Sequence, residues 1–323
     1  MWSSLRLLAC LVAATVTASA FAQADSYPNR TIRIVVGFSP GGFTDVLGRV
    51  IAQKLHERLG QPVIVENKPG ATGVIGADLI AKSKPDGYNL LMGHSNSNSV
   101  APALFPKLPY DVIADFTPIV LVASTPLLLT VHPSVKANDV ASFIALAKKD
   151  PNLRYASSGN GSAQHLAAEQ FMLMTKTQMI HVPYKGSGQA IVDLLSGQVE
   201  LNFDSPPNTL QHIRSGKLKA LGITSAKRSA LLPNVPTIAE SGVPGYEMSQ
   251  WFGVFGPAGL PPPITNKLAT EINAILKSPD VAEKIASQGG DLIGGKPEAF
   301  AAFLKTDTVR WAKLIRDANI KPE

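Results

Sequence analysis

The sequence predicts an α/β protein with two lobes, each a mostly parallel sheet flanked by helices. Short runs of β-branched residues alternate with helical patterns, which is typical of parallel sheets covered on both faces. This strand–loop–helix pattern begins at Thr31 and begins again at Arg154. A chain of 323 residues is also long enough to form two domains of ordinary size.

The first strand–loop–helix unit occupies residues 31–60. Residues 31–36 (TIRIVV) form a short β-branched run, as in a buried parallel strand. After a loop rich in Gly and Pro, apolar residues recur every four positions from Leu47 to Leu59 and mark one face of a helix that Gly60 ends. The elements expected next are a strand at 62–66, a helix around 74–80 and a strand at 88–92.

The alternation restarts after a long apolar stretch at 116–131. The elements expected there are a helix at 138–149, strands at 154–157 and 179–182, helices after 162 and around 191–195, and strands at 199–203 and 217–224. The tail is expected to form a strand at 251–256 and helices near 264–277, 280–288 and 297–318. Three closing helices most economically return to cover the first lobe. We therefore expect residues 23–124 and 228–323 to form lobe 1 and residues 125–227 to form lobe 2.

The first residues have the layout of a secretory signal peptide. Arg6, a short apolar run and the small residues Ala20 and Ala22 predict that residues 1–22 are removed by cleavage after Ala22. Cys10, the single cysteine, lies in this segment, and a cysteine-free chain suits an oxidising compartment. A lipoprotein box ending at Cys10 is the weaker alternative, because too few apolar residues precede it. The chain is expected to be exported and soluble.

The charge distribution argues against a nucleic-acid partner. The formal net charge is +6, and removal of Arg6 leaves 29 Lys+Arg against 24 Asp+Glu, or +5. These residues are scattered, with no basic run longer than Lys148–Lys149 and no basic segment interleaved with aromatic residues. A single cysteine and six histidines without metal-binding spacing also give no reason to expect a metal or cofactor.

Two loops rich in Gly and Ser are the strongest candidates for a binding site. GFSPGGFTD (37–45) and SSGNGSAQH (157–165) each follow a strand and open a helix, one in each lobe. Such loops bind ligands in α/β sheets, because a helix start offers unpaired N–H groups and the positive end of the helix dipole. Neither loop contains Lys or Arg, so a bound anion would be held by backbone N–H groups, hydroxyls and waters. The alternative is that Thr44, Asp45 and Ser162 only cap their helices.

Other loops at the same sheet edges could add contacts. The segment from Gly93 to Asn96 follows the strand at 88–92, and Asp204 follows the strand at 199–203. Asp204 could accept a hydrogen bond from a ligand ammonium or hydroxyl, or it could cap the next helix. The segment from Lys185 to Gly188 is a further candidate, for which a simple turn is the favoured interpretation.

Several separated stretches together resemble one known family. They are YPNRTIRIVVGFSPGGFTD, GQPVIVENKPGATGVIGAD, KPDGYNLLMG, YASSGNGSAQHLAAEQF, HVPYKGSGQA and PNVPTIAESGVPGYE. In this order they resemble the tripartite tricarboxylate transporter substrate-receptor family, the Bug or TctC-like extracytoplasmic solute-binding proteins. The resemblance extends from about Tyr27 to the last helix.

The resemblance implies a type II periplasmic binding-protein fold, whose two lobes close on a small carboxylate like a Venus flytrap. The implied ligand-binding residues are Phe38, Ser39, Gly42, Thr44 and Asp45 on one wall, Ser157, Gly159, Ser162 and His165 on the other, and Ser95 and Asp204 toward the distal end. Family members often have a small residue such as Ala where this chain has Ser39 and Pro40, which leaves the placement of ordered waters open.

The function implied is that of a monomeric periplasmic receptor without catalytic activity. Its ligand would be a di- or tricarboxylate, an amino acid or an aromatic acid, and its partners the large and small membrane subunits of a tripartite tricarboxylate transporter. Two alternatives stay open. A sensing module would use the same cleft but meet a signalling partner, and an exported hydrolase would use Ser162 and His165, although the segment GHSNS (93–97) fails the GxSxG pattern of hydrolases.

Overall fold

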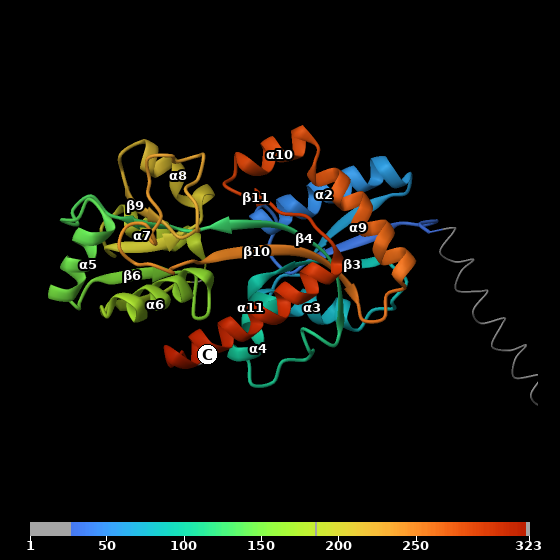
Figure 1. Ribbon diagram of the computed structural model, residues 1–323, viewed down its shortest axis with the longest axis horizontal. Helices are drawn as coiled ribbons and strands as arrows, with labels where there is room; N and C mark the ends of the chain where they lie inside the picture. Colours follow the sequence, from blue (N-terminus) through green and yellow to red (C-terminus); the bar gives the residue numbers. More distant parts are fainter. Residues whose placement is uncertain (1–26, 185, 321–323) are drawn as a thin grey trace, which may run out of the picture.

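Two mixed sheets flanked by helices form two lobes that lie side by side in the computed structural model (Figure 1). The structure describes residues 27–184 and 186–320. The expected signal peptide, residues 1–22, lies outside the described residues, as does Lys185. Within the described ranges, no helix combines the length and the apolar character needed to cross a membrane.

The first sheet has six strands in the order β11-β4-β10-β3-β1-β2. They are β1 (Ile32–Val36), β2 (Val63–Asn67), β3 (Asn89–His94), β4 (Phe116–Pro126), β10 (Ser249–Pro257) and β11 (Asp291–Leu292). Strand β1 pairs in parallel with β2 and β3, and Ile34 lies opposite Val65 and Leu90. Strand β10 runs antiparallel to β3 and β4. The parallel pairing expected for the first strands of the chain is therefore present. The sheet is mixed because β10 and β11 pair antiparallel to their neighbours.

Helices cover both faces of this sheet, because successive strand residues point to opposite sides. On one face lie α2 (Phe43–Leu59), α9 (Pro262–Leu276) and α10 (Pro279–Ala286), and on the other α3 (Val74–Ala81), α4 (Ala101–Leu104) and α11 (Pro297–Asp317). Ile34 and Val36 pack with α2 and α9, whereas Val35 packs with α3 and α11. The three closing helices thus pack on the first sheet.

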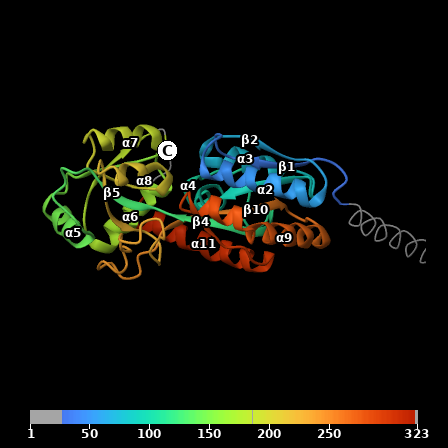
Figure 2. The ribbon, with the colours of Figure 1, turned by 90° about the horizontal axis from the view of Figure 1, so that it is seen from above.

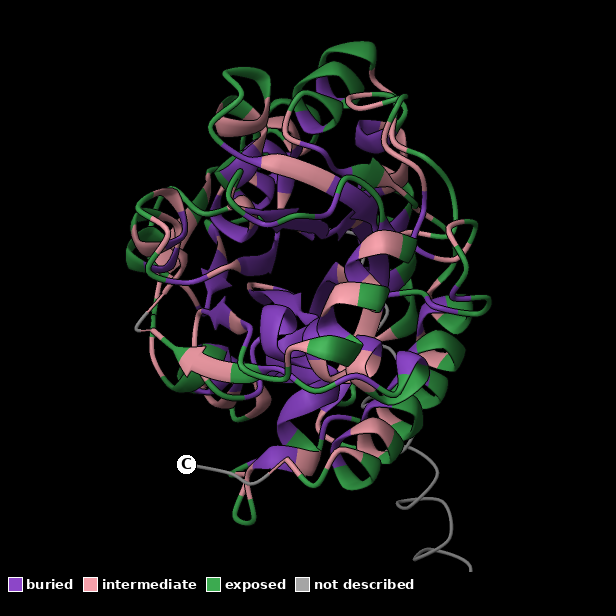
Figure 3. Cartoon of the chain, turned by 90° about the vertical axis from the view of Figure 1, so that its left-hand side faces the viewer, coloured by how far each residue is buried: buried purple, intermediate pink, exposed green. Residues whose placement is uncertain are grey.

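The second sheet has five strands in the order β7-β6-β8-β5-β9. They are β5 (Leu128–Val131), β6 (Arg154–Ser157), β7 (Ile180–Pro183), β8 (Leu201–Asp204) and β9 (Lys219–Ile223). The helices of this lobe are α5 (Val140–Lys149), α6 (Ala163–Thr175), α7 (Ser187–Leu195) and α8 (Pro206–Arg214). Phe143, Phe171 and Phe203 form the aromatic centre of its larger core. Figure 3 shows buried residues concentrated on the sheets and exposed residues on the outer helix surfaces.

Two strands carry the chain between the lobes (Figure 1). Leu127 joins β4 to β5, close to the expected crossing at 124–126. The second crossing differs from the expectation, because residues 225–248 pack on lobe 2. The Met248 N–H donates to Thr224 O at 2.9 Å, and Ile238 and Tyr246 belong to the core of lobe 2. We therefore propose a second boundary at 248/249 in place of 227/228.

The C-terminal half of α11 also contacts the second lobe. Trp311 and Ile315 belong to the same buried cluster as Phe171 of α6. Figure 2 shows α11 extending from the first lobe to its junction with the second. A helix assigned to lobe 1 from its place in the chain therefore spans the hinge.

Candidate functional site

A cavity of about 290 Å³ lies between the lobes at the loops that follow β1 and β6. The residues that line it are Phe38, Gly41, Gly42, Phe43, Thr44, His94, Asn96, Thr125, Ser158, Ala163, Gln164, Ser187, Ser205, Pro207, Asn208, Gln250, Phe252 and Gln288. None of these residues is an Asp, Glu, Lys or Arg. Hydroxyls, amides, aromatic rings and helix N-termini therefore determine what these lining residues can bind.

On the lobe 1 wall, helix α2 begins at the cavity without a side-chain cap. Gly42 is its N-cap residue and makes no side-chain hydrogen bond, and Phe43 and Thr44 form its first turn. Gly41 has a φ of +90°, a conformation that favours glycine and lets the chain turn into the helix. The first-turn N–H groups and the positive end of the helix dipole together make an anion-binding position.

The Asp45 carboxylate holds this loop in place. It accepts hydrogen bonds from Gly41 N at 3.0 Å, Arg49 Nε at 2.9 Å and Asn67 Nδ2 at 2.8 Å. Burial opposes the charge, but these hydrogen bonds outweigh burial and lower the pKa of Asp45. Asp45 is only 3% exposed and does not line the cavity, so it acts on the site through the loop.

On the lobe 2 wall, helix α6 begins at the same cavity. The Ser162 hydroxyl caps the helix by accepting from His165 N at 3.3 Å, which leaves the first-turn residues Ala163 and Gln164 at the cavity. The Gln164 amide joins three loops. Its Oε1 accepts from Ser158 Oγ at 2.8 Å, and its Nε2 donates to Ser187 Oγ at 2.9 Å and to Asp204 Oδ1 at 3.3 Å.

Asp204 lies beneath this wall and is 1% exposed. Its Oδ1 accepts from Ser205 N at 2.7 Å and from Asn208 Nδ2 at 2.9 Å, in addition to Gln164. Burial raises the pKa of Asp204, against the effect of these hydrogen bonds. The carboxylate positions three residues that line the cavity and is not itself one of them.

Aromatic rings form the rest of the lobe 1 wall. The His94 ring lies between Phe38 and Phe252, with a centroid separation of 4.9 Å to each, and Phe43 contacts Phe252 edge-on. Burial lowers the pKa of His94 to about 4, so the ring is neutral near pH 7. This wall offers apolar area to the carbon skeleton of a ligand.

A stack of three rings supports the 157–165 loop from behind. The rings of His165 and His181 lie 4.0 Å apart and nearly parallel, and Tyr155 stacks on His181 at 4.8 Å. Gly161 N donates to His165 Nδ1 at 3.0 Å, and Ser157 Oγ lies 2.6 Å from His181 Nε2. Ser157 is 1% exposed and lies outside the cavity lining, so this Ser–His contact fixes the loop and offers no accessible nucleophile.

The structure brings the two predicted loops together but changes which side chains reach the cavity. Of the predicted site residues, Phe38, Gly42 and Thr44 line it. The predicted residues outside the lining are Ser39, Asp45, Ser95, Ser157, Gly159, Ser162, His165 and Asp204. Most of these bond to their own loops: Ser162 caps its helix and Ser95 Oγ contacts the His94 ring at 3.3 Å. Ser39 is exposed.

The residues that sequence reasoning missed lie one position away from predicted ones or on other elements. Ser158 lines the cavity where Ser157 was expected, because the Ser157 hydroxyl is turned away from the cavity and contacts His181. Gln164 lines the cavity because it lies in the first turn of α6. The hydroxyl of the cap residue Ser162 is bonded to the backbone of its own helix and leaves this position to Gln164. Thr125 and Gln250 come from the hinge strands, which no pattern in the sequence connects with the two loops.

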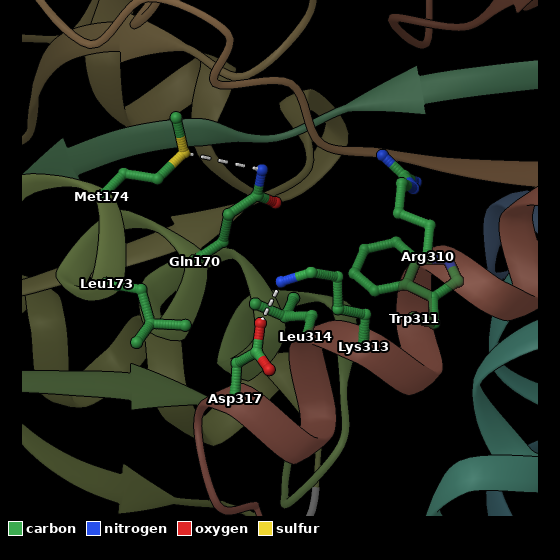
Figure 4. Close-up of a pocket in the computed structure, with 8 residues that line it drawn as sticks. All are labelled: Gln170, Leu173, Met174, Arg310, Trp311, Lys313, Leu314 and Asp317. Atoms are coloured by element: carbon green, nitrogen blue, oxygen red, sulfur yellow. Dashed lines mark hydrogen bonds and ion pairs between the residues drawn. The ribbon is translucent and has the colours of Figure 1, made fainter.

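A second cavity, of about 360 Å³, lies between α6 and α11 (Figure 4). Its charged groups are paired: Lys313 with Asp317, and Arg310 with Asp307 at 2.9 Å. Its residues come from the C-terminal halves of both helices, where the dipole favours cations over anions. This cavity therefore lacks the features that make the interlobe cavity suited to an anion.

Within residues 27–184 and 186–320, no cluster of His, Cys, Asp or Glu side chains is arranged to hold a metal ion. The groups that surround the interlobe cavity are suited to binding a ligand. They combine two helix N-termini from different lobes with aromatic and amide side chains, which can hold a small molecule that carries an anionic group.

Comparisons with known proteins agree with this architecture. A family model described as a tripartite tricarboxylate transporter family receptor matches residues 47–320. Protein BugT of Bordetella pertussis is 42% identical over 320 residues, which cover 98% of this chain and 98% of that protein. The structure of R. palustris Rpa4515 with adipate is 37% identical, with a TM-score of 0.84 over 92% of this chain and 100% of that chain. The periplasmic binding protein BugD is 36% identical, with a TM-score of 0.80 over 92% of this chain and 100% of that chain.

Proposed function

The chain belongs to the tripartite tricarboxylate transporter family of receptors, and from this premise we propose that it binds a small organic carboxylate in the cavity between its lobes. Proteins of this family are periplasmic solute-binding receptors, and the chain is such a receptor and not an enzyme. We propose in addition that its ligand is a carboxylate. We also propose that it delivers this ligand to the membrane subunits of a tripartite transporter. Rpa4515, which was solved with adipate, supports the choice of a carboxylate.

One observation carries the proposal. The N-termini of α2 and α6, from different lobes, open on one cavity, and none of the described residues that line it carries a formal charge. A helix terminus stabilises an adjacent anion by about 0.3–2 kcal/mol, so two termini supply at most about 4 kcal/mol. Micromolar affinity requires about 8 kcal/mol. Direct hydrogen bonds and the exclusion of water between the lobes must supply the rest, which is why the two walls have to act together.

The direct test measures binding to the chain without residues 1–22. Calorimetry and thermal-shift assays with mono-, di- and tricarboxylates, amino acids and aromatic acids should find saturable one-to-one binding, with a Tm that rises with ligand concentration. Small-angle scattering should record a more compact particle with the bound ligand. Absence of both binding and compaction across the whole panel would remove the proposal.

A second experiment separates delivery to a transporter from sensing. Deletion of the gene should abolish uptake of the acid that binds best in vitro, and restoring the chain should recover it. Intact uptake together with altered gene expression would favour the sensing alternative.

A further inference from the structure

We infer that Gln250 determines ligand specificity, because its amide N–H₂ group is fixed toward the cavity and selects carboxylic acids that carry a second oxygen acceptor. This inference rests on the proposed function and concerns the same cavity. The acceptor could be a second carboxylate, an amide carbonyl or a hydroxyl oxygen.

Gln250 lies on the floor of the cavity, on a strand that joins the lobes. It belongs to β10, where it is half-buried and pairs across the sheet with Thr125 of β4, another residue of the cavity lining. Phe252, two positions further along the same strand, lines the cavity as well. The alternate residues Ser249 and Trp251 line a separate hollow beside α11. Strand alternation therefore directs the Gln250 side chain to the ligand face.

The neighbouring His94 ring determines which end of the Gln250 amide is presented. The Asn96 backbone N–H donates to His94 Nδ1 at 2.9 Å, so Nδ1 carries no proton. The neutral ring then bears its proton on Nε2, which lies 3.0 Å from Gln250 Oε1. Nε2–H donates to this oxygen. A flipped amide would place two donors against each other, so the ring holds the amide in one orientation.

The amide nitrogen is thereby left as a hydrogen-bond donor at the cavity. Among the described residues, none accepts a hydrogen bond from Gln250 Nε2 at the distances that define the other bonds of this wall. The side-chain amide of Gln164, which also lines the cavity, has both its ends bonded within lobe 2. Gln250 thus offers a donor whose direction does not depend on the ligand.

A fixed donor discriminates between ligands of equal length. An oxygen acceptor completes the hydrogen bond, whereas a methyl group leaves the N–H₂ group without a partner and an ammonium group opposes it. Leaving a buried donor unpaired typically reduces affinity by about 10- to 100-fold. The chain should therefore prefer an acid with a second oxygen acceptor over the matched monocarboxylate and the matched ω-amino acid.

The experiment measures dissociation constants for two matched series by calorimetry. The probes are adipate, hexanoate and 6-aminohexanoate, and the shorter set succinate, butyrate and 4-aminobutyrate. In at least one series the wild-type chain should bind the dicarboxylate at least about tenfold more tightly than the other two. Gln250→Met, which keeps the length of the side chain and removes the donor, should reduce this ratio to about threefold or less. Gln53→Met, on the exposed face of α2, should leave the ratio unchanged.

A second variant tests the role of His94 as a positioning residue. His94→Phe keeps a ring between Phe38 and Phe252 but removes the proton that orients the amide. The preference of His94→Phe for the dicarboxylate over the matched ligands should fall toward that of Gln250→Met. Circular dichroism and Tm should establish that both variants fold. A wild-type ratio near one, or a ratio that both folded variants retain, overturns the inference and leaves the proposed function standing. Failure of every probe to bind the wild-type chain overturns both.

Discussion

Three buried polar side chains shape the binding cavity mainly by positioning their neighbours. Asp45 holds the Gly41–Gly42 turn, Gln164 joins three loops of lobe 2, and Asp204 accepts from Gln164 and Asn208. Each such hydrogen bond contributes about 1 kcal/mol, and more when one partner is charged. The consequence is a wall of neutral lining residues with fixed orientation, which suits a site that selects ligands by the placement of hydrogen bonds.

Thr44 tests whether the start of α2 binds the ligand anion. It is 5% exposed, lies in the first turn and lines the cavity. In Thr44→Asp the new carboxylate occupies the helix terminus, repels the ligand and stabilises the helix. We expect carboxylate affinity to fall by about 100-fold or more, close to 3 kcal/mol, while Tm stays level or rises. Thr44→Asn, of matched size but neutral, should stay within about threefold of wild type, and equal binding by both variants would contradict an anion site at this terminus.

The buried His94 ring makes stability depend on pH. Burial lowers the pKa of His94 from 6.5 to about 4, so the unfolded chain takes up a proton in this interval and the folded chain does not. The stabilising contribution is complete above pH 6.5 and decreases as the pH falls toward 4, by about 3 kcal/mol at most. Burial also lowers the pKa of His181 to about 4, which acts in the same direction.

Urea unfolding at a series of pH values checks this dependence. The unfolding free energy of wild type minus that of His94→Phe should decrease as the pH falls from 6.5 to about 4, because only the wild type loses stability through this ring. Comparison of the two proteins removes the contribution of the carboxylates that titrate in the same range. A difference that is constant across this interval would rule out a neutral, buried His94.

At the scale of elements, α11 is tied to the hinge strand β10 by one carboxylate. Asp307 Oδ2 accepts from Trp251 Nε1 at 2.6 Å and from Trp311 Nε1 at 2.9 Å, and Asp307 Oδ1 accepts from Arg310 at 2.9 Å. Trp251 lies between Gln250 and Phe252, which face the cavity on the other side of the strand. The helix is thus anchored directly behind the floor of the cavity.

Asp307→Ala should destabilise the protein by about 2–4 kcal/mol, because it leaves two buried indole N–H groups without an acceptor. Urea unfolding measures this loss. Tryptophan emission should shift at the same time, since both tryptophans of the described chain bond to this one oxygen. Asp317→Ala removes an exposed ion pair near the end of the same helix and should cost less than about 1 kcal/mol. A similar small effect of Asp307→Ala would mean that packing alone anchors α11.

At the scale of the whole molecule, the two lobes touch on both sides of the cavity. A Cβ atom at Gly161 of lobe 2 would collide with Leu104 of lobe 1. On the other side, a Cβ at Gly289 would lie 2.7 Å from Pro206. Glycines at these two places allow an approach of the lobes that any side chain would hinder, and this approach encloses the cavity.

Gly161→Ala should therefore weaken carboxylate binding by about tenfold or more, through the collision with Leu104 and through strain at a φ of +69°. Adding Leu104→Ala removes the collision and should restore part of the affinity, while the backbone strain remains. Calorimetry on the two single variants and the double variant measures the coupling. Strictly additive effects would argue that this contact does not control the approach of the lobes.

The sequence predicts most elements well because their signals are local. The β-branched run at 31–36 and the four-residue spacing from Leu47 to Leu59 correspond to β1 and α2. Helix α8 received no predicted bounds, although Pro206 and Pro207 are well tolerated at a helix start. The second lobe boundary that we propose differs from the predicted one because residues 225–248 pack on lobe 2 with few regular elements to signal it in the sequence.

The two loops of the site were predicted, but several of the predicted side chains do not line the cavity. Spacing alone cannot tell whether a hydroxyl such as that of Ser162 faces a ligand or bonds to its own helix. It also cannot predict that Asp204 is covered by Gln164 and Asn208, because that depends on contacts between separate loops.

By itself, the sequence determined the α/β class, the two lobes and the two glycine-rich helix starts without cations, because periodicity, helix caps and loop composition are properties of neighbouring residues. Only the tertiary structure decided which side chains line the cavity, how His94 orients Gln250 and where the lobes touch. These features join residues such as His94 and Gln250 that are far apart in the chain, and their geometry exists only once both sheets have packed and the strands between the lobes have paired.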